Sequence, residues 1–363
     1  MKKILGQVKA VETLLAGLRS GRFAHAWIFA GPRGVGKFTT AIELARIILD
    51  PGAGPDCAVD DAGETARLID AGVHPDLHVV RKELARFSDD ADVRKKKLTN
   101  IPIDVLREHV IGGMVGGKFQ EAPAYRTSVR GHGKVFIIDE AELLDKDGQG
   151  VLLKTLEEPP LGTYFILVTS RPHRLFPTIH SRCRHVAFRP LDDAAMNQWF
   201  GAAGLDVSGP EQAWIREFCQ GSPGMATIAA EYGFHKWHLT LAPMLDQLAT
   251  GFFPADLGAT MASLVDAFAT EWVKRNLNAS KRSANNDGAR YLFTILAAHA
   301  DRQLRAAVAQ GDPPDAILKA IDLIAEAERQ LWANVNLKQV LENLAVQWTQ
   351  ATSRQPAAIT GSS

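Results

Sequence analysis

The chain has 363 residues, of which 46% are apolar and 23% charged. This length suits two or three domains with a large buried core, and the composition excludes a largely disordered chain. The 41 basic residues balance the 41 acidic ones, so no global field draws the protein to nucleic acid. No apolar run reaches the roughly 18 residues of a membrane span, and the start turns polar too soon for a secretory signal. We therefore expect a cytoplasmic protein without membrane contact.

Short apolar runs alternate with helical patterns over residues 1–190. The runs are too short and too continuous for amphipathic helices, so they predict buried parallel strands. Helical patterns such as 38–49 and 102–110 lie between them, which predicts crossovers that cover both faces of the sheet. The expected fold class is α/β, with three layers: a parallel sheet between two layers of helices. The predicted strands are 26–30, 76–80, 134–139, 163–169 and 185–188.

The strand pattern ends near Pro190. Short helical segments over 191–234 predict a small lid domain, and long Ala- and Leu-rich helices over 235–350 predict an all-α third domain. The tail, 351–363, has no apolar periodicity and is predicted to be flexible. Helix breaks are expected at Gly251, near 285–288, and at Pro313. Surface loops are expected at 50–75 and 81–100.

A glycine-rich loop, Gly-Pro-Arg-Gly-Val-Gly-Lys, follows the first predicted strand and precedes a helix. In this context a GxxxxGK loop wraps phosphate groups. Gly31, Gly34 and Gly36 let backbone N–H groups converge on the phosphate oxygens, and Lys37 reaches the terminal phosphates. The sequence therefore predicts a nucleotide-binding loop.

The residue after the lysine departs from this pattern. Phe38 stands where a Ser or Thr hydroxyl ordinarily holds magnesium. Thr39 is an alternative hydroxyl, but the helix turns it about 100° away. ATP and magnesium binding is therefore expected to be weakened, and the loop can cradle phosphate without supporting catalysis.

Polar residues end two of the predicted strands. Asp139 and Glu140 stand at the end of the strand KVFIID, where one carboxylate ordinarily holds the water shell of magnesium and another orients the attacking water. The alternative is that the two acids cap the following helix. Ser170 follows the strand TYFILVT and is a candidate sensor of the γ-phosphate, or a plain hydroxyl at a strand end.

The glycine-rich loop, the Asp139-Glu140 pair, LLKTLEEPP at 152–160 and Ser181-Arg182-Cys183 occur in this order. With these motifs the chain resembles the AAA+ clamp-loader subunits of bacterial DNA polymerase III over nearly its whole length. The resemblance implies an AAA+ P-loop domain, a helical lid and a helical collar that joins subunits. It also implies that Gly6-Gln7 contacts adenine and that 334–344 is the final collar helix.

The Ser-Arg-Cys motif is the most specific mark of this family. The resemblance implies that Arg182 is an arginine finger, projected into the ATP site of a neighbouring subunit. The alternative is an arginine paired with an acid of its own domain.

Two kinds of subunit share this architecture, the ATP-hydrolysing gamma/tau motor and the delta-prime stator. Three features favour the delta-prime kind. Phe38 occupies the magnesium position, and Met225 lies near the position where motor subunits carry a sensor arginine. The chain also ends soon after the collar. We expect no intrinsic ATPase activity, although the chain would belong to the DNA polymerase III holoenzyme. The implied partners are gamma/tau and delta subunits in a hetero-pentamer, and through them the sliding clamp and primer-template DNA. The alternatives are a motor subunit and, more remotely, a free-standing P-loop kinase.

The family commonly carries a four-cysteine zinc module, from which this chain departs. It has three cysteines, widely spaced, and only Cys57 lies in the corresponding segment. Four soft ligands cannot be assembled from one thiol, so we predict no zinc. Cys219, between apolar residues on a helix, is predicted to lie in the core.

The densest basic stretch of the sequence contains Arg81, Lys82, Arg86 and 94–97. Interleaved acids weaken its field, so we predict a solvated loop rather than a contact with DNA or a partner.

Overall fold

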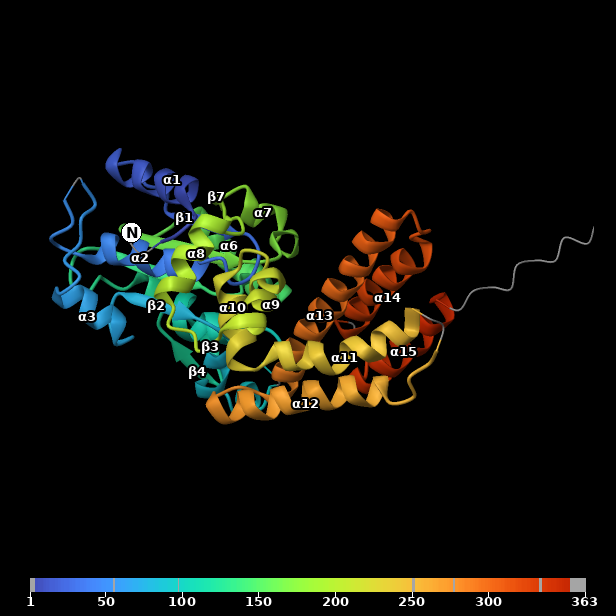
Figure 1. Ribbon diagram of the computed structural model, residues 1–363. Helices are drawn as coiled ribbons and strands as arrows, with labels where there is room; N and C mark the ends of the chain where they lie inside the picture. Colours follow the sequence, from blue (N-terminus) through green and yellow to red (C-terminus); the bar gives the residue numbers. More distant parts are fainter. Residues whose placement is uncertain are drawn as a thin grey trace, which may run out of the picture. The chain divides into compact units, whose positions relative to one another are not determined.

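A computed structural model describes residues 4–54, 56–96, 98–249, 252–276, 278–332 and 335–352. The chain divides into two compact units, which Figure 1 shows coloured along the sequence. Unit 1 comprises Met1–Asp206 and Cys219–Thr227, and unit 2 comprises Val207–Phe218 and Ile228–Ser363. The boundaries near 190, 234 and 350 that the sequence indicated stay predictions.

Unit 1 is built on a five-stranded parallel sheet with the order β2-β5-β6-β1-β7. Each strand lies within one residue of its predicted range, so the predicted α/β class is confirmed. The strands are β1 (Ala26–Ala30), β2 (Leu77–Val80), β5 (Lys134–Ile138), β6 (Thr163–Thr169) and β7 (Arg184–Ala187). β1 pairs with both β6 and β7. The connection after β1 runs to β2 on one side and the connection after its neighbour β6 runs to β7 on the other, so the carboxyl edge between β1 and β6 is the switch point of the sheet, and the glycine-rich loop follows β1 there.

Both faces of this sheet are buried, because successive side chains of a strand point to opposite faces. Ile28, Phe136 and Phe165 belong to one apolar core, and Phe29 and Ile137 belong to the other. Helices α1 (Val8–Arg19), α2 (Lys37–Leu49) and α3 (Glu64–Asp70) contribute to the second core. Helices α5 (Ile103–Leu106), α6 (Lys146–Glu157) and α7 (Pro177–His180) contribute to the first. The three layers of the prediction are therefore present.

The segments predicted as surface loops contain regular structure. The first includes α3, and the second includes α4 (Ala91–Arg94) and a turn of 3₁₀ helix over Lys82–Phe87. Apolar side chains anchor the second segment, because Ala85, Val93 and Leu98 are buried. The antiparallel hairpin of β3 (Gly113–Val115) and β4 (Lys118–Gln120) was not predicted.

Three helices follow the sheet within 191–234, the range in which short helical segments were predicted. They are α8 (Asp193–Ala202), α9 (Gly209–Cys219) and α10 (Pro223–Glu231). Cys219 is buried, as predicted.

In its described residues, unit 2 contains helices and their connections but no strand. Its long helices are α11 (Phe234–Ala249), α12 (Leu257–Arg275), α13 (Lys281–Gln310), α14 (Asp315–Trp332) and α15 (Leu337–Thr352). α12 packs against α13 and α15, and α14 packs against α13 and α15. Rings of Phe234, Phe268 and Tyr291 meet in the core of this unit, with centroid distances of 5.1 to 6.1 Å. The predicted all-helical region is confirmed.

One predicted helix break is wrong. α13 runs without interruption through 285–288 and begins instead at Ser280, whose side chain accepts a hydrogen bond from the N–H of Ser283. Gly288 serves packing: a Cβ there would lie 2.8 Å from the ring of Phe268. The break at Pro313 is confirmed, because α13 ends at the left-handed Gly311. Gly251 and 353–363 lie outside the described residues.

No helix in the described part of the chain combines the length and apolar composition that a membrane span requires.

Candidate functional site

The glycine-rich loop connects the end of β1 to the start of α2. Gly34 and Gly36 have φ angles of 72° and 95°, in the left-handed region that glycine tolerates. The side chain of Lys37 turns back into the loop, where Nζ donates hydrogen bonds to the carbonyls of Gly31, at 2.7 Å, and Pro32. Burial lowers the pKa of Lys37 to about 8. The loop therefore folds around its own ammonium group.

The side chain of Gln7 holds the loop from one side. Its Nε2 donates to the carbonyls of Val35, at 3.0 Å, and Arg189, at 2.6 Å. Its Oε1 accepts from the N–H of Arg189. Gln7 is 4% exposed. Its buried side-chain amide forms its hydrogen bonds with these backbone groups. The contact between Gly6-Gln7 and adenine stays a prediction.

The start of α10 holds the loop from another side. Ser222 Oγ donates to the carbonyl of Arg33 at 2.8 Å, and the N–H of Gly224 donates to the carbonyl of Gly34 at 2.9 Å. The N–H of Met225 donates back to Ser222 Oγ. The position that the sequence compared with a sensor arginine therefore lies beside the loop and carries Met225.

Asp139 follows β5 and is held by Arg81, which follows β2. The Nε of Arg81 lies 3.2 Å from Oδ2 of Asp139. The same guanidinium lies 4.3 Å from the centroid of the Phe38 ring, in a cation–π contact. Burial raises the pKa of Asp139, while Arg81 acts to lower it. The Asp139 carboxylate is thus paired with the Arg81 guanidinium, which also contacts the Phe38 ring.

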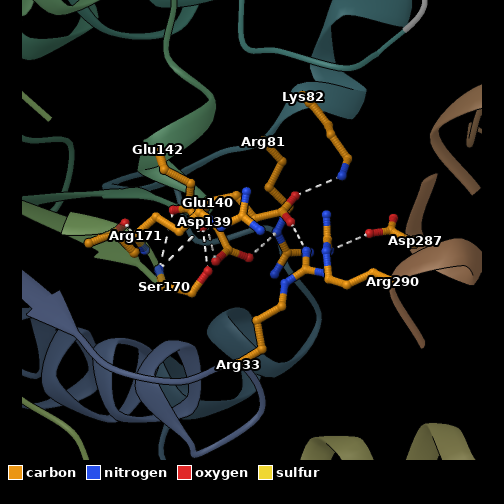
Figure 2. Close-up of polar contacts among 11 residues, drawn as sticks. Arg33, Arg81, Lys82, Asp139, Glu140, Glu142, Ser170, Arg171, Asp287 and Arg290 are labelled. Carbon is orange, nitrogen blue, oxygen red and sulfur yellow. Dashed lines mark hydrogen bonds and ion pairs between the residues drawn. The ribbon is translucent and has the colours of Figure 1, made fainter. Parts of the chain in front are cut away.

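Glu140 lies between two further basic side chains (Figure 2). It forms ion pairs with Arg33 and with Lys82, whose Nζ lies 2.8 Å from Oε2. Burial acts to raise the pKa of Glu140, but Lys82 and Arg33 outweigh it and the pKa is lowered. The helix that directly follows the two acids is a 3₁₀ turn over Ala141–Leu143 with Glu140 at its N-cap position, and no side chain forms a capping hydrogen bond there. The alternative that Asp139 and Glu140 cap the following helix is therefore wrong.

Ser170, at the end of β6, is bound to an acid that the sequence analysis did not single out. Its Oγ donates to Oε1 of Glu142 at 2.6 Å, and its N–H donates to the same carboxylate (Figure 2). Thr39 is exposed. Among the described residues, its side chain forms no hydrogen bond with Asp139 or Glu140. The structure thus brings Ser170 to the carboxyl edge of the sheet and leaves Thr39 outside.

The prediction of a solvated loop is wrong for Lys82, whose side chain is 11% exposed; Arg81 is exposed, as predicted, but is paired with Asp139. Val80 of β2 pairs with Ile138 of β5, so the next residues of these parallel strands are neighbours at the same edge. The N–H of Asp139 also donates to the carbonyl of Val80. One signal was available in the sequence: Arg81 comes directly after a predicted strand.

Arg182 lies just after α7 and has a local acidic partner. Its Nη2 lies 2.5 Å from Oε1 of Glu157, and its Nη1 donates to the carbonyl of Thr178 at 2.9 Å. The side chain is 32% exposed. The Arg182 guanidinium is therefore at the surface, held by the ion pair with Glu157 and by hydrogen bonds to the carbonyl of Thr178 and Oγ of Ser181.

Within the described ranges, no group of three or more His, Cys, Asp or Glu side chains is arranged to hold a metal ion. Cys57 is buried in a left-handed turn, and His74 accepts from the N–H of Asp76 through Nδ1. The prediction of no zinc stays a prediction.

The parallel sheet with β1 between β6 and β7, the loop that folds around Lys37, and the acids at the end of β5 define a P-loop protein of the AAA+ type. The family described as "DNA polymerase III, delta subunit" matches residues 6–192. The chain belongs to this family of clamp-loader AAA+ proteins, and the resemblance read from the motifs is confirmed.

Relatives of both kinds of subunit match the chain. DNA polymerase III subunit delta' of Bacillus subtilis is 31% identical over 192 residues, which are 52% of this chain and 50% of the relative. Subunit gamma/tau of Mycobacterium bovis is 31% identical over 53% of this chain and 29% of the relative. Subunit tau of Escherichia coli is 34% identical over 52% of this chain and 25% of the relative. The matched regions span half or less of these relatives.

Proposed function

We propose that the protein is a cytoplasmic, delta-prime-type subunit of the DNA polymerase III clamp loader. In this role it joins gamma/tau and delta subunits in a hetero-pentamer that opens the sliding clamp and loads it on primer-template DNA. It has no ATPase activity of its own and supplies Arg182 to the ATP site of a neighbour.

One observation carries the proposal that this subunit does not hydrolyse ATP. Magnesium in a P-loop site is held by a hydroxyl after the lysine and through a carboxylate at a strand end. Here Phe38 replaces the hydroxyl, and Asp139 is paired with Arg81. Neither group is available to a hydrated cation. The residues present therefore do not fit a magnesium ion.

The surface position of Arg182 supports the proposed finger. A finger must leave its own subunit's contacts and reach an interface, and its charge then stabilises the transferring γ-phosphoryl group. The pair with Glu157 is partly exposed on both sides, at 32% and 47%. Exposed pairs of this kind contribute only about 0 to 1 kcal/mol, so a phosphate can replace Glu157 at little cost.

The helices of unit 2 support the proposed collar. Large apolar side chains of α13 and α14, such as Val308 and Leu318, are exposed in the isolated chain. In the proposed collar these exposed side chains of the long helices would be buried against helices of other subunits.

The test has two parts, ATP turnover by the isolated chain and assembly with the other subunits, and each part can refute its own half of the proposal. The isolated chain is incubated with excess ATP and magnesium, and no turnover is expected. Robust turnover that Lys37→Ala abolishes would identify a motor subunit instead. The chain is then mixed with gamma/tau and delta subunits and passed over a size-exclusion column. We expect it to elute in their complex, and separate elution would refute the clamp-loader assignment.

A further inference from the structure

The site of the glycine-rich loop has two sides that differ in what the chain supplies. The phosphate side keeps its parts: Lys37 is seated in the loop, and Gly34 and Gly36 are in left-handed conformations that turn backbone N–H groups inward. Among the described residues, no hydrogen bond uses the N–H of Gly34, Val35 or Gly36 as its donor. These three backbone N–H groups can therefore donate hydrogen bonds to a phosphate group.

The cation side is filled by the protein itself. The guanidinium of Arg81 touches both groups between which a divalent ion is ordinarily held, the residue after the lysine and the strand-end carboxylate. It is oriented from two directions, by the Phe38 ring and by Asp139. The register of β2 beside β5 fixes this arrangement, since Val80 and Ile138 are paired.

The paired side chains around the loop carry no net negative charge without a metal, since three cations face two carboxylates. Asp139 is matched by Arg81, and Glu140 is matched by Arg33 and Lys82, as Figure 2 shows. The carboxylates therefore do not repel an incoming phosphate as unpaired acids would. Lys37 adds a further positive charge on the phosphate side.

We propose that Arg81 is the built-in cation of this site, in place of a divalent metal, and that the loop binds the phosphates of a nucleoside diphosphate in their metal-free form. A guanidinium is permanently charged and suits phosphate oxygens, and the Arg81 side chain is 45% exposed, so it can face a ligand. Added magnesium weakens binding, because it draws the phosphates away and brings a like charge towards Arg81. This inference goes beyond the proposed function.

Calorimetric titration of the full chain with ADP, once with EDTA and once with excess magnesium, tests the inference. We expect ADP to bind in EDTA and to bind more weakly in magnesium. Lys37→Ala should remove binding, which locates it at the loop. Arg81→Ala should weaken binding in EDTA by about tenfold or more, as expected for loss of a charged partner. Arg126→Ala is the matched control, because Arg126 is exposed and paired with Glu121; it should bind ADP as the wild type does.

Three results would overturn the inference: no binding of ADP in either buffer, binding that requires magnesium, or an Arg81→Ala variant that binds like Arg126→Ala. The first two are read on the wild-type chain, so they do not depend on whether a variant folds. Arg81→Lys, which keeps the charge on the site, should retain part of the affinity in EDTA. Binding that requires magnesium would also count against the proposed lack of ATPase activity, whereas the other two results leave the proposed function untouched, and none of them bears on assembly.

Discussion

The guanidinium of Arg182 and the carboxylate of Glu157 form an ion pair, with Nη2 2.5 Å from Oε1. Glu157 ends α6, and Arg182 follows α7, so the pair joins two neighbouring helices of unit 1. The proposed finger and the rival structural role of Arg182 make different predictions about the two members of this pair.

The first prediction concerns these two residues. Arg182→Ala should change the thermal stability of the chain little, since an exposed pair contributes about 0 to 1 kcal/mol. It should lower ATP hydrolysis by the reconstituted complex, because a finger contributes roughly 10³ to 10⁵ in rate at the site it serves. The fall in total turnover should be partial, since other interfaces keep their own fingers. Glu157→Gln should leave hydrolysis at or above the wild-type rate, because it frees Arg182.

A structural role would give another pattern. Arg182→Ala and Glu157→Gln would then lower the melting temperature by similar amounts, and both would leave hydrolysis and clamp loading unchanged. That outcome would reject the finger.

The second prediction concerns pH and Lys37. Burial lowers its pKa from 10.5 to about 8. Between these values the unfolded chain binds more protons here than the folded chain, so the free energy of unfolding rises with pH in this window. Below about pH 8 both states are charged and the penalty is fully present. Lys37→Met removes it, so the stability of this variant relative to wild type should fall between pH 8 and 10.5, by up to about 3 kcal/mol.

Urea unfolding of both proteins at several pH values measures this difference. Lys154→Met, at an exposed position of α6, is the control, and its difference from wild type should stay constant with pH. A constant difference for Lys37→Met as well would contradict the prediction.

The third prediction concerns the contact between the loop and the start of α10. A Cβ at Gly34 would lie 2.4 Å from Ser222 Oγ and 3.0 Å from the Cα of Gly224. Gly21 has a similar φ of 64° but nothing within 4 Å. Gly21→Ala should therefore cost only the left-handed strain, about 1 to 2 kcal/mol, and Gly34→Ala should cost about 1 to 3 kcal/mol more. Equal losses in thermal unfolding would show that the start of α10 does not press on the loop.

The fourth prediction concerns Asp76, which is 1% exposed. Its carboxylate accepts hydrogen bonds from the N–H groups of Val129, at 2.7 Å, and Arg130, at 2.9 Å, and from the hydroxyl of Ser128. Asp76→Ala leaves these donors without their acceptor and should cost about 2 to 4 kcal/mol in urea unfolding. Asp56→Ala, at an exposed position, should change stability by about 0.5 kcal/mol or less. A loss for Asp76→Ala no larger than for Asp56→Ala would show that this loop is not held by the carboxylate.

Local sequence patterns were enough to predict the strands and the loop. A buried parallel strand must be a short continuous apolar run, so 26–30 and 163–169 were predicted to the residue. The loop was predicted because its glycines and Lys37 are local requirements of a phosphate cradle, contiguous in the chain. The family followed from the order of such local motifs.

The surroundings of Phe38 and Asp139 depend on long-range packing that no local pattern predicts. Arg81 and Lys82 were predicted to belong to a solvated basic loop, because their acidic partners are distant in the sequence: Lys82 and Glu140 are 58 residues apart. No local sequence pattern specifies the order of strands in a sheet, so these pairs could not be predicted. Gly288 likewise looked like a helix break, since only the packing of Phe268 against it shows why the side chain must be absent. Local chemistry fixes which segments fold and what a loop can bind, whereas the pairing of β2 with β5 brings a guanidinium to the cation position and so decides how the site is charged.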